Sequence, residues 1–346
     1  MKNPFGDYAK IIVREEIVKP QSDLERILEV EKEILEKYKD DKRFDNIDAD
    51  RDIYDSVLLD VQERLKDILT QELILQTYIS ARDNPEENNE AIVRGFYSGA
   101  LLEIISTENP EMDIVINGRG KTFNFLFYHV HTVKNLTLTN VNGFAILMKA
   151  GSDNGTVQYL TINNITGDSL LREAGSSSGS IMYATLSNIK GFGTLSGSAR
   201  SSGSIEYVTL TNITGDSILD YAGSNKGSAK NITLLNIKGD GTLIRAGNNF
   251  GNATHLALMN IDGNNTLFYQ NDGRINKTIP TTTVKRDAFK QMIDQDQNGI
   301  NKKTKKILTK IETIVETIHL LSFKDKKNAH EEIAHLQRTV FTGKNT

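Results

Sequence analysis

The 346-residue chain contains no cysteine, which excludes disulfide bonds and metal sites with thiolate ligands. It has no apolar run approaching the roughly 20 residues that a membrane-spanning helix needs. Residues 1–20 mix charged and apolar side chains and lack the apolar segment of a secretory signal. These absences lead us to expect a cytoplasmic protein without membrane partners.

A 24-residue repeat runs six times without interruption from Val133 to Asn276. Each unit alternates apolar and polar residues, the period of a strand with one buried face. A fixed period in the twenties is typical of a solenoid, where neighbouring turns bury each other's apolar sides. The chain resembles the single-stranded parallel β-helix class, and no specific family within it is recognised. We predict a mainly β protein of six 24-residue turns with helical flanks.

The apolar residues of each unit define two walls of this coil. Three aliphatic positions are expected to face inward in every unit, from Leu136, Leu138 and Val141 in the first to Leu256, Leu258 and Ile261 in the sixth. A second apolar pair recurs later in most units, for example Ile146-Leu147 and Ile218-Leu219. This pair predicts a second wall that packs against the first.

One asparagine and two glycines also recur in the repeat. The asparagine precedes a buried aliphatic residue, so we expect a ladder of buried, hydrogen-bonded amides at Asn140, Asn164, Asn188, Asn212, Asn236 and Asn260. Glycines at one corner predict positive φ or close backbone approach at Gly143, Gly167, Gly191, Gly215, Gly239 and Gly263. A second corner carries Gly155, Gly179, Gly203, Gly227 and Gly251.

The repeat divides the chain into three regions of different charge. Residues 1–113 hold 15 basic and 28 acidic side chains, residues 114–280 hold 13 and 9, and residues 281–346 hold 13 and 8. We therefore predict an acidic helical N-terminal region, a parallel β-helix with an N-terminal capping turn, and a basic helical C-terminal region. A basic tail is one signature of nucleic-acid binding, but the acidic region offers it a partner within the chain or in a second copy.

Helical spacing of apolar residues predicts three N-terminal helices, beginning near Ser22, spanning about 51–82, and spanning about 90–106. Residues 114–118 read as a degenerate first turn of the solenoid. The bulky residues that follow it are expected to close the end of the coil: Phe123, Phe125, Phe127 and Tyr128.

The C-terminal region carries an aliphatic seam with alternating spacings of four and three, at Ile307, Ile311, Ile314 and Ile318. An outward position that is polar in the first four turns becomes apolar at Leu235 and Met259. Because apolar residues beside a terminal sheet edge invite aggregation, we expect the C-terminal helices to dock over the last two turns.

Three motifs are candidates for chemistry, and none is complete. Asp294-x-Asp296-x-Asn298-Gly299 matches the first half of a calcium loop, but Lys305 replaces the final glutamate. His129-x-His131 has no third zinc ligand at a suitable spacing. A column of Asp168, Asp216 and Asp240 is interrupted by Phe192 and is typical of ordinary turns. We therefore expect no catalytic residues, no metal and no cofactor.

Three tyrosines, Tyr159, Tyr183 and Tyr207, occupy one outward position in consecutive turns. Such a ladder can bind sugar rings, bases or a partner helix, or it can stack on itself to stiffen the sheet or lie under a helical arm, and we favour the structural interpretation. The tyrosines and the aliphatic seam are our candidate partner-binding residues. The favoured function is a non-catalytic scaffold that binds a macromolecular assembly or itself. The alternatives are an RNA- or ribonucleoprotein-binding factor and a carbohydrate-binding or carbohydrate-active β-helix.

Overall fold

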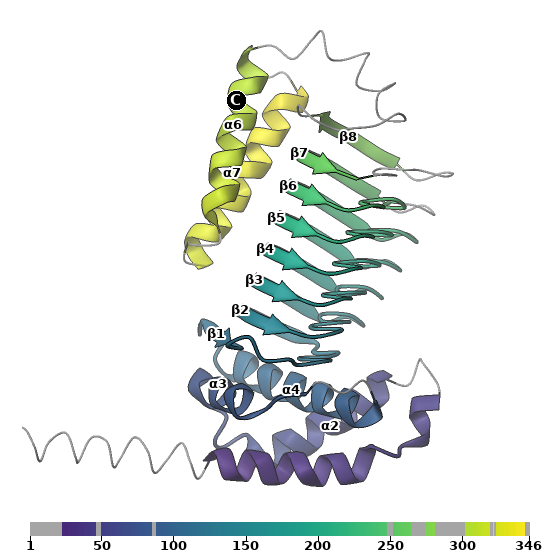
Figure 1. Ribbon diagram of the computed structural model, residues 1–346, viewed down its shortest axis with the longest axis vertical. Helices are drawn as coiled ribbons and strands as arrows, with labels where there is room; N and C mark the ends of the chain where they lie inside the picture. Colours follow the sequence, from purple (N-terminus) through teal and green to yellow (C-terminus); the bar gives the residue numbers. More distant parts are fainter. Residues whose placement is uncertain are drawn as a thin grey trace, which may run out of the picture.

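The computed structural model describes residues 23–45, 50–84, 88–247, 252–263, 274–280, 302–318, 321 and 323–342. The solenoid forms a rod, and one parallel sheet forms a side of it (Figure 1). The strands of this sheet follow one another in sequence order. Its strands are β1 (Ile114–Asn117), β2 (Thr132–Asn142), β3 (Thr156–Thr166), β4 (Ser180–Lys190), β5 (Ser204–Thr214), β6 (Ser228–Lys238), β7 (Asn252–Asp262) and β8 (Arg274–Pro280). The predicted parallel β-solenoid of about six turns with helical flanks is confirmed.

The strands pair with a constant offset of 24 residues, so equivalent repeat positions stack on one another. Leu136 pairs with Leu160, and Leu160 pairs in turn with Ala184. The inward positions of the first unit are 136, 138 and 141, so their spacing changes from two residues to three. The change arises because Asn140 adopts a left-handed backbone conformation with φ +55°. The same conformation recurs at Asn164, Asn188, Asn212 and Asn236. A residue in this conformation is typical of a β-bulge, and here the bulge repeats in register along the sheet.

The second wall of the coil is built from consecutive turns rather than from a strand. In the first unit φ is positive at every second residue from Ala145 to Asp153. Within the unit, the Met148 amide donates a hydrogen bond to the Ala145 carbonyl, and the Ala150 amide donates to the Leu147 carbonyl, in each case three residues back. Successive amides also bond alternately to the turns above and below, as Lys149 does to Arg172 and Gly151 does to Val130. The polar backbone is thus satisfied without strand geometry.

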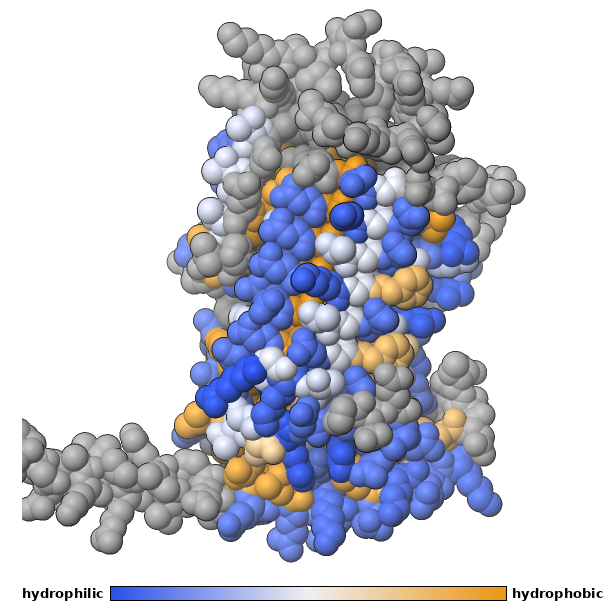
Figure 2. Space-filling model, in the orientation of Figure 1, coloured by the Kyte–Doolittle hydropathy of each residue, from blue (hydrophilic) through white to orange (hydrophobic). Residues whose placement is uncertain are grey.

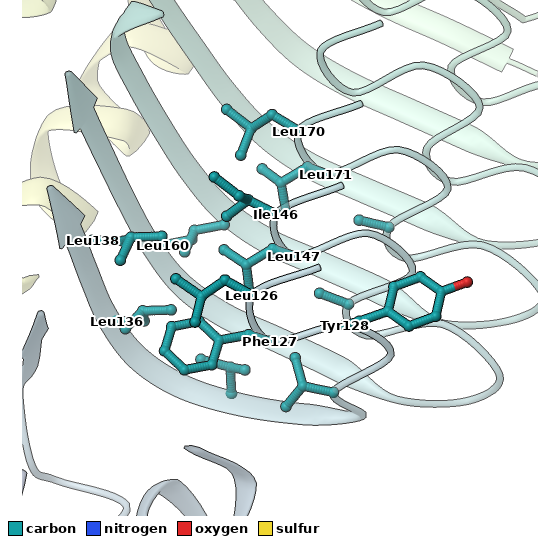
Figure 3. Close-up of a cluster of buried hydrophobic side chains, with 14 of the residues drawn as sticks. Leu126, Phe127, Tyr128, Leu136, Leu138, Ile146, Leu147, Leu160, Leu170 and Leu171 are labelled. Carbon is teal, nitrogen blue, oxygen red and sulfur yellow. The ribbon is translucent and has the colours of Figure 1, made fainter. Parts of the chain in front are cut away.

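The two walls enclose one continuous hydrophobic core. Figure 3 shows the strand residues Leu136, Leu138 and Leu160 facing the turn-wall residues Ile146 and Leu147. All five side chains are buried. The predicted inward aliphatic set and the second apolar wall are therefore confirmed in the described turns, and only the backbone conformation of the second wall was not foreseen.

The N-terminal helices pack across the first turn and share its core. They comprise a helix over residues 23–38, the short η1 (Lys42–Asp45), α2 (Asp50–Leu65), α3 (Glu72–Ala81) and α4 (Asn89–Glu108). The prediction of a single helix over residues 51–82 is wrong, because two helices, α2 and α3, occupy this range. The chain turns after Leu65, burying Leu69, so that α3 lies beside β1.

Side chains of this helical cap bond to the backbone of the first coil. On α3, Gln76 accepts from the Asn117 amide at 2.6 Å. On α4, Ser98 accepts from the Phe127 amide at 3.0 Å and Glu103 from the His131 amide at 2.8 Å. Unpaired strand edges are templates for association with other molecules. The contacts from the helical cap occupy part of the backbone edge at the first turn of the solenoid.

Helices α6 (Lys302–Thr317) and α7 (Phe323–Thr342) form a hairpin that lies along the outer face of the sheet (Figure 1). No helix among the described residues is both long and apolar enough to cross a membrane. The calcium-like segment from Asp294 to Gly299 lies outside the described residues.

Candidate functional site

The tyrosine ladder is a close stack of rings on the outer face of β3, β4 and β5. Ring centroids are 4.9 Å apart between Tyr159 and Tyr183 and 4.8 Å apart between Tyr183 and Tyr207. The rings are parallel within 9°. The separation follows the spacing of paired strands, so the sheet itself imposes the stack.

Helix α7 covers the middle of this ladder. His330 lies 5.7 Å from the Tyr183 ring, centroid to centroid, and 6.3 Å from the Tyr207 ring. Its Nε2 is 2.9 Å from the Thr185 hydroxyl on β4, and its Nδ1 is 3.4 Å from the Thr209 hydroxyl on β5. The neighbouring Glu331 accepts a hydrogen bond from the Tyr183 hydroxyl at 3.3 Å. The stack is therefore partly a docking surface for the chain's own helix.

The surface beneath the hairpin, here called the covered face, crosses β3 to β6. It consists of Thr161, Tyr183, Thr185, Ser187, Thr209, Thr211, Thr233 and Leu235, all of them buried. The hairpin thus reaches further along the rod than the last two turns. The expected docking on Leu235 is confirmed, whereas the Met259 side chain lies outside the described residues.

The aliphatic seam meets Leu235 in a hydrophobic cluster separate from the main core. From α6 the cluster includes Ile311 and Val315, with Ile307 and Ile314 partly buried at its margin, and Ile318 follows directly after the helix. Helix α7 contributes Ala329 and Ile333. The seam residues that we selected as partner-binding candidates therefore pack within their own chain in this structure.

Burial and charge shift the pKa of two groups on α7. Burial lowers the pKa of His330 to about 3, and the nearby positive charge of Lys326 adds to the effect. Burial also lowers the pKa of Lys326 to about 8, while the negative charge of Asp113 opposes that shift. Both groups are more easily protonated when the hairpin leaves the sheet.

We predict that acid releases the hairpin. When the hairpin is released, His330 has the ordinary histidine pKa of 6.5 and binds a proton below that pH. When the hairpin is docked, the pKa of His330 is about 3, so the proton binds only near pH 3. Docking therefore weakens as pH falls through this interval, by about 2–3 kcal/mol at pH 4.5. Small-angle X-ray scattering should show a larger maximum dimension at pH 4.5 than at pH 7.

Among the described residues, the ionisable groups around His330 include Lys326 and the neighbouring Glu331 on α7, Tyr183 on β4 and Tyr207 on β5. The variant His330→Gln retains a hydrogen-bonding side chain but cannot titrate. It should stay compact at pH 4.5. Equal expansion of the variant and the parent protein would assign the acid response to other groups.

The asparagine ladder lies at the surface, contrary to our expectation of buried amides. Asn164, Asn188 and Asn212 are exposed, and Asn140 and Asn236 are half-buried. The amide groups are nevertheless linked by hydrogen bonds of 2.5–3.1 Å from Asn117 to Asn164 and from Asn188 to Asn236. Asn188 instead donates to Asn163. The side chain of Asn260 lies outside the described residues.

Positive φ explains asparagine at this exposed position, because asparagine tolerates the left-handed region better than most residues do. We predict that Asn212→Ala lowers the free energy of unfolding by about 1–2 kcal/mol and that Asn212→Gly lowers it by about 1 kcal/mol less. Chemical denaturation of both variants measures the difference. Equal losses would mean that the amide hydrogen bonds, rather than the backbone conformation, select asparagine.

An exposed strip follows the asparagine ladder along the rod. It contains Asn164, Thr166, Asn188, Lys190, Asn212, Thr214 and Lys238, and all seven are exposed. Register pairing places Thr166 beside Lys190, and Thr214 beside both Lys190 and Lys238. Figure 2 shows hydrophilic and neutral side chains in rows along the rod. The strip presents amides, hydroxyls and two ammonium groups at the strand repeat.

The carboxylates at the glycine corner bond to the backbone of the next turn. Asp168 Oδ1 accepts from the Phe192 amide at 2.7 Å, and Asp216 Oδ1 accepts from the Asp240 amide at the same distance. These contacts tie adjacent turns together, which is a structural role.

The histidine pair lies where the cap meets the solenoid. The His129 and His131 rings are 5.6 Å apart and pack against Tyr54. Burial lowers the pKa of His129 to about 4, with Lys149 adding to the shift. No group of three or more potential metal ligands occurs in the part of the chain that the structure describes. The two rings pack against an aromatic side chain of the cap.

The sequence indicated that the tyrosine ladder could lie under a helical arm, but it did not identify the contact of α7 with Tyr183 or the residues that attach the cap. His330 could have been noticed as a histidine on the apolar side of a helix. Gly95 and Gly99 could have been noticed as two glycines one helical turn apart, which permits close packing against another backbone. No family model, curated protein or solved structure matches the chain.

Proposed function

We propose that this protein is a non-catalytic cytoplasmic scaffold that binds a macromolecular partner along its rod. The exposed strip carries the proposal. The backbones of Thr166, Lys190, Thr214 and Lys238 are held in register by hydrogen-bonded strands, so little backbone conformational entropy remains to be lost when a partner binds there. A repeating row of polar groups fits a partner of extended shape better than it fits a small substrate.

Two features of the site favour binding over catalysis. The aspartates of the glycine corner are engaged in backbone hydrogen bonds rather than directed together into a cleft. The tyrosine ladder, which would be needed to stack sugar rings, is partly covered by α7. These features support a scaffold more strongly than a carbohydrate-active protein.

The proposal predicts that partner capture depends on the exposed strip. Lys190→Glu with Lys238→Glu reverses two charges there and should reduce capture from native lysate by about tenfold or more, because charge reversal disfavours an interface. The matched control is Arg172→Glu with Arg200→Glu, which reverses two exposed charges in the turn wall.

Affinity capture followed by mass spectrometry and nucleic-acid staining measures the outcome. A partner lost with the strip variant and kept with the control supports the scaffold. Capture of RNA alone, removed by ribonuclease, would favour the ribonucleoprotein alternative. Equal capture by both variants would show that the strip is not the binding surface.

A further inference from the structure

The covered face has the composition of a solvent-facing sheet surface. Among its eight residues only Leu235 is aliphatic, and the others carry hydroxyl groups. The Thr161 and Thr211 hydroxyls are buried by the hairpin without a hydrogen-bond partner. Because unsatisfied buried polar groups oppose an interface, the docking of the hairpin on this face is weaker than its area suggests.

The hairpin has its own cluster and can leave without opening the solenoid. Leu235 is the sheet residue of that cluster among the described side chains, and the remaining members come from α6, α7 and the segment that joins them. The main core is contained within the N-terminal helices and the coil. Separation of the hairpin would therefore break the contacts of Leu235, Thr185, Thr209 and Tyr183 and leave the main core intact.

The connection to the hairpin is long. Residues 281–301 supply 21 residues between the end of β8 and the start of α6. Both ends of this connection lie at the same end of the rod (Figure 1). A chain of this length can extend up to about 70 Å, which allows the hairpin to reach another molecule.

We propose that the α6–α7 hairpin is an exchangeable arm, which docks on the covered face of a second copy as well as on its own. The proposal rests on the scaffold function and identifies one partner as a second copy of this chain. The contacts in the exchanged form are those already seen within one chain, so the balance between the two forms is set by concentration. Reciprocal exchange gives a closed dimer, and one-way exchange gives a linear assembly.

The chain contains no cysteine, so only thiols that are introduced by substitution react with a maleimide, and a direct crosslinking test is feasible. Two full-length single-cysteine proteins, Tyr183→Cys and Glu331→Cys, are mixed and treated with a short bismaleimide. These positions are adjacent across the docked interface. The control mixture replaces Tyr183→Cys with Arg200→Cys, an exposed position in the turn wall. A doubly substituted chain reports docking within one molecule.

Hairpin exchange predicts crosslinked dimers at least about tenfold more abundant in the first mixture than in the control. The doubly substituted chain should also crosslink internally when dilute. Internal crosslinking with no excess of dimers in the mixture would overturn the exchange while leaving docking intact. Absence of both products would overturn docking itself. Neither outcome bears on partner capture by the exposed strip, which the Lys190 and Lys238 variants test separately.

Discussion

Replacing Gly191 by alanine is expected to prevent stable folding. Gly191 has φ +157°, and an added Cβ would overlap the Gly167 carbonyl oxygen of the turn below and lie 2.5 Å from its carbonyl carbon. The obstacle is backbone of the turn below rather than a movable side chain, so the two turns must separate to relieve it. We expect a loss of at least about 4 kcal/mol in the free energy of unfolding, measured by thermal and chemical denaturation.

Gly193, two residues away, provides the matched control. It also has positive φ, at +72°, but the nearest atoms to an added Cβ are 3.9 Å away. Gly193→Ala should therefore lower the free energy of unfolding by only about 1 kcal/mol. Equal losses from the two alanine variants would show that close stacking of the turns is not what requires glycine at this corner.

Replacing Gly95 by alanine is expected to detach the N-terminal cap. An added Cβ would overlap the Phe125 carbonyl oxygen and lie 2.7 Å from the Phe125 Cβ and 3.0 Å from the Tyr128 Cβ. Alanine normally stabilises a helix relative to glycine by about 1 kcal/mol, so a destabilised variant reverses the usual sign. We expect a loss of about 3 kcal/mol or more together with increased binding of a hydrophobic dye.

Gly99 gives a graded comparison on the same helix face. Its added Cβ would lie 2.9 Å from the Tyr128 carbonyl oxygen and 3.2 Å from the Tyr54 ring, so Gly99→Ala should have a smaller effect than Gly95→Ala. Stabilisation by both variants would mean that α4 does not pack directly against the first turn.

The solenoid was predictable because the pattern of apolar residues that specifies it repeats at a fixed period. Each inward aliphatic position is repeated in six units, and a one-residue slip would expose the whole set. The glycine corners were predictable for the same reason. The turn wall was not, because residues with ordinary strand or helix preferences, such as Leu147 and Leu171, take positive φ there. Contacts with adjacent turns override their local preferences.

The candidate site was predictable only in outline. The sequence indicated a helical seam and an apolar position at Leu235, and these meet. It did not indicate how far the hairpin extends, since the contacts of His330 with Thr185 and Thr209 join residues over 100 positions apart. The asparagine ladder was placed in the interior because its neighbours are aliphatic, although a bulge turns it outward.

The central claim is that the exposed strip, outside the hairpin-covered face, binds the partner. Hydrogen–deuterium exchange of the full-length chain, free and with its captured partner, tests this claim most directly. We predict new protection in the segments 164–166, 188–190, 212–214 and 236–238, with little change in the turn wall. Protection confined to the helical cap or the turn wall, with the strip unchanged, would contradict the account.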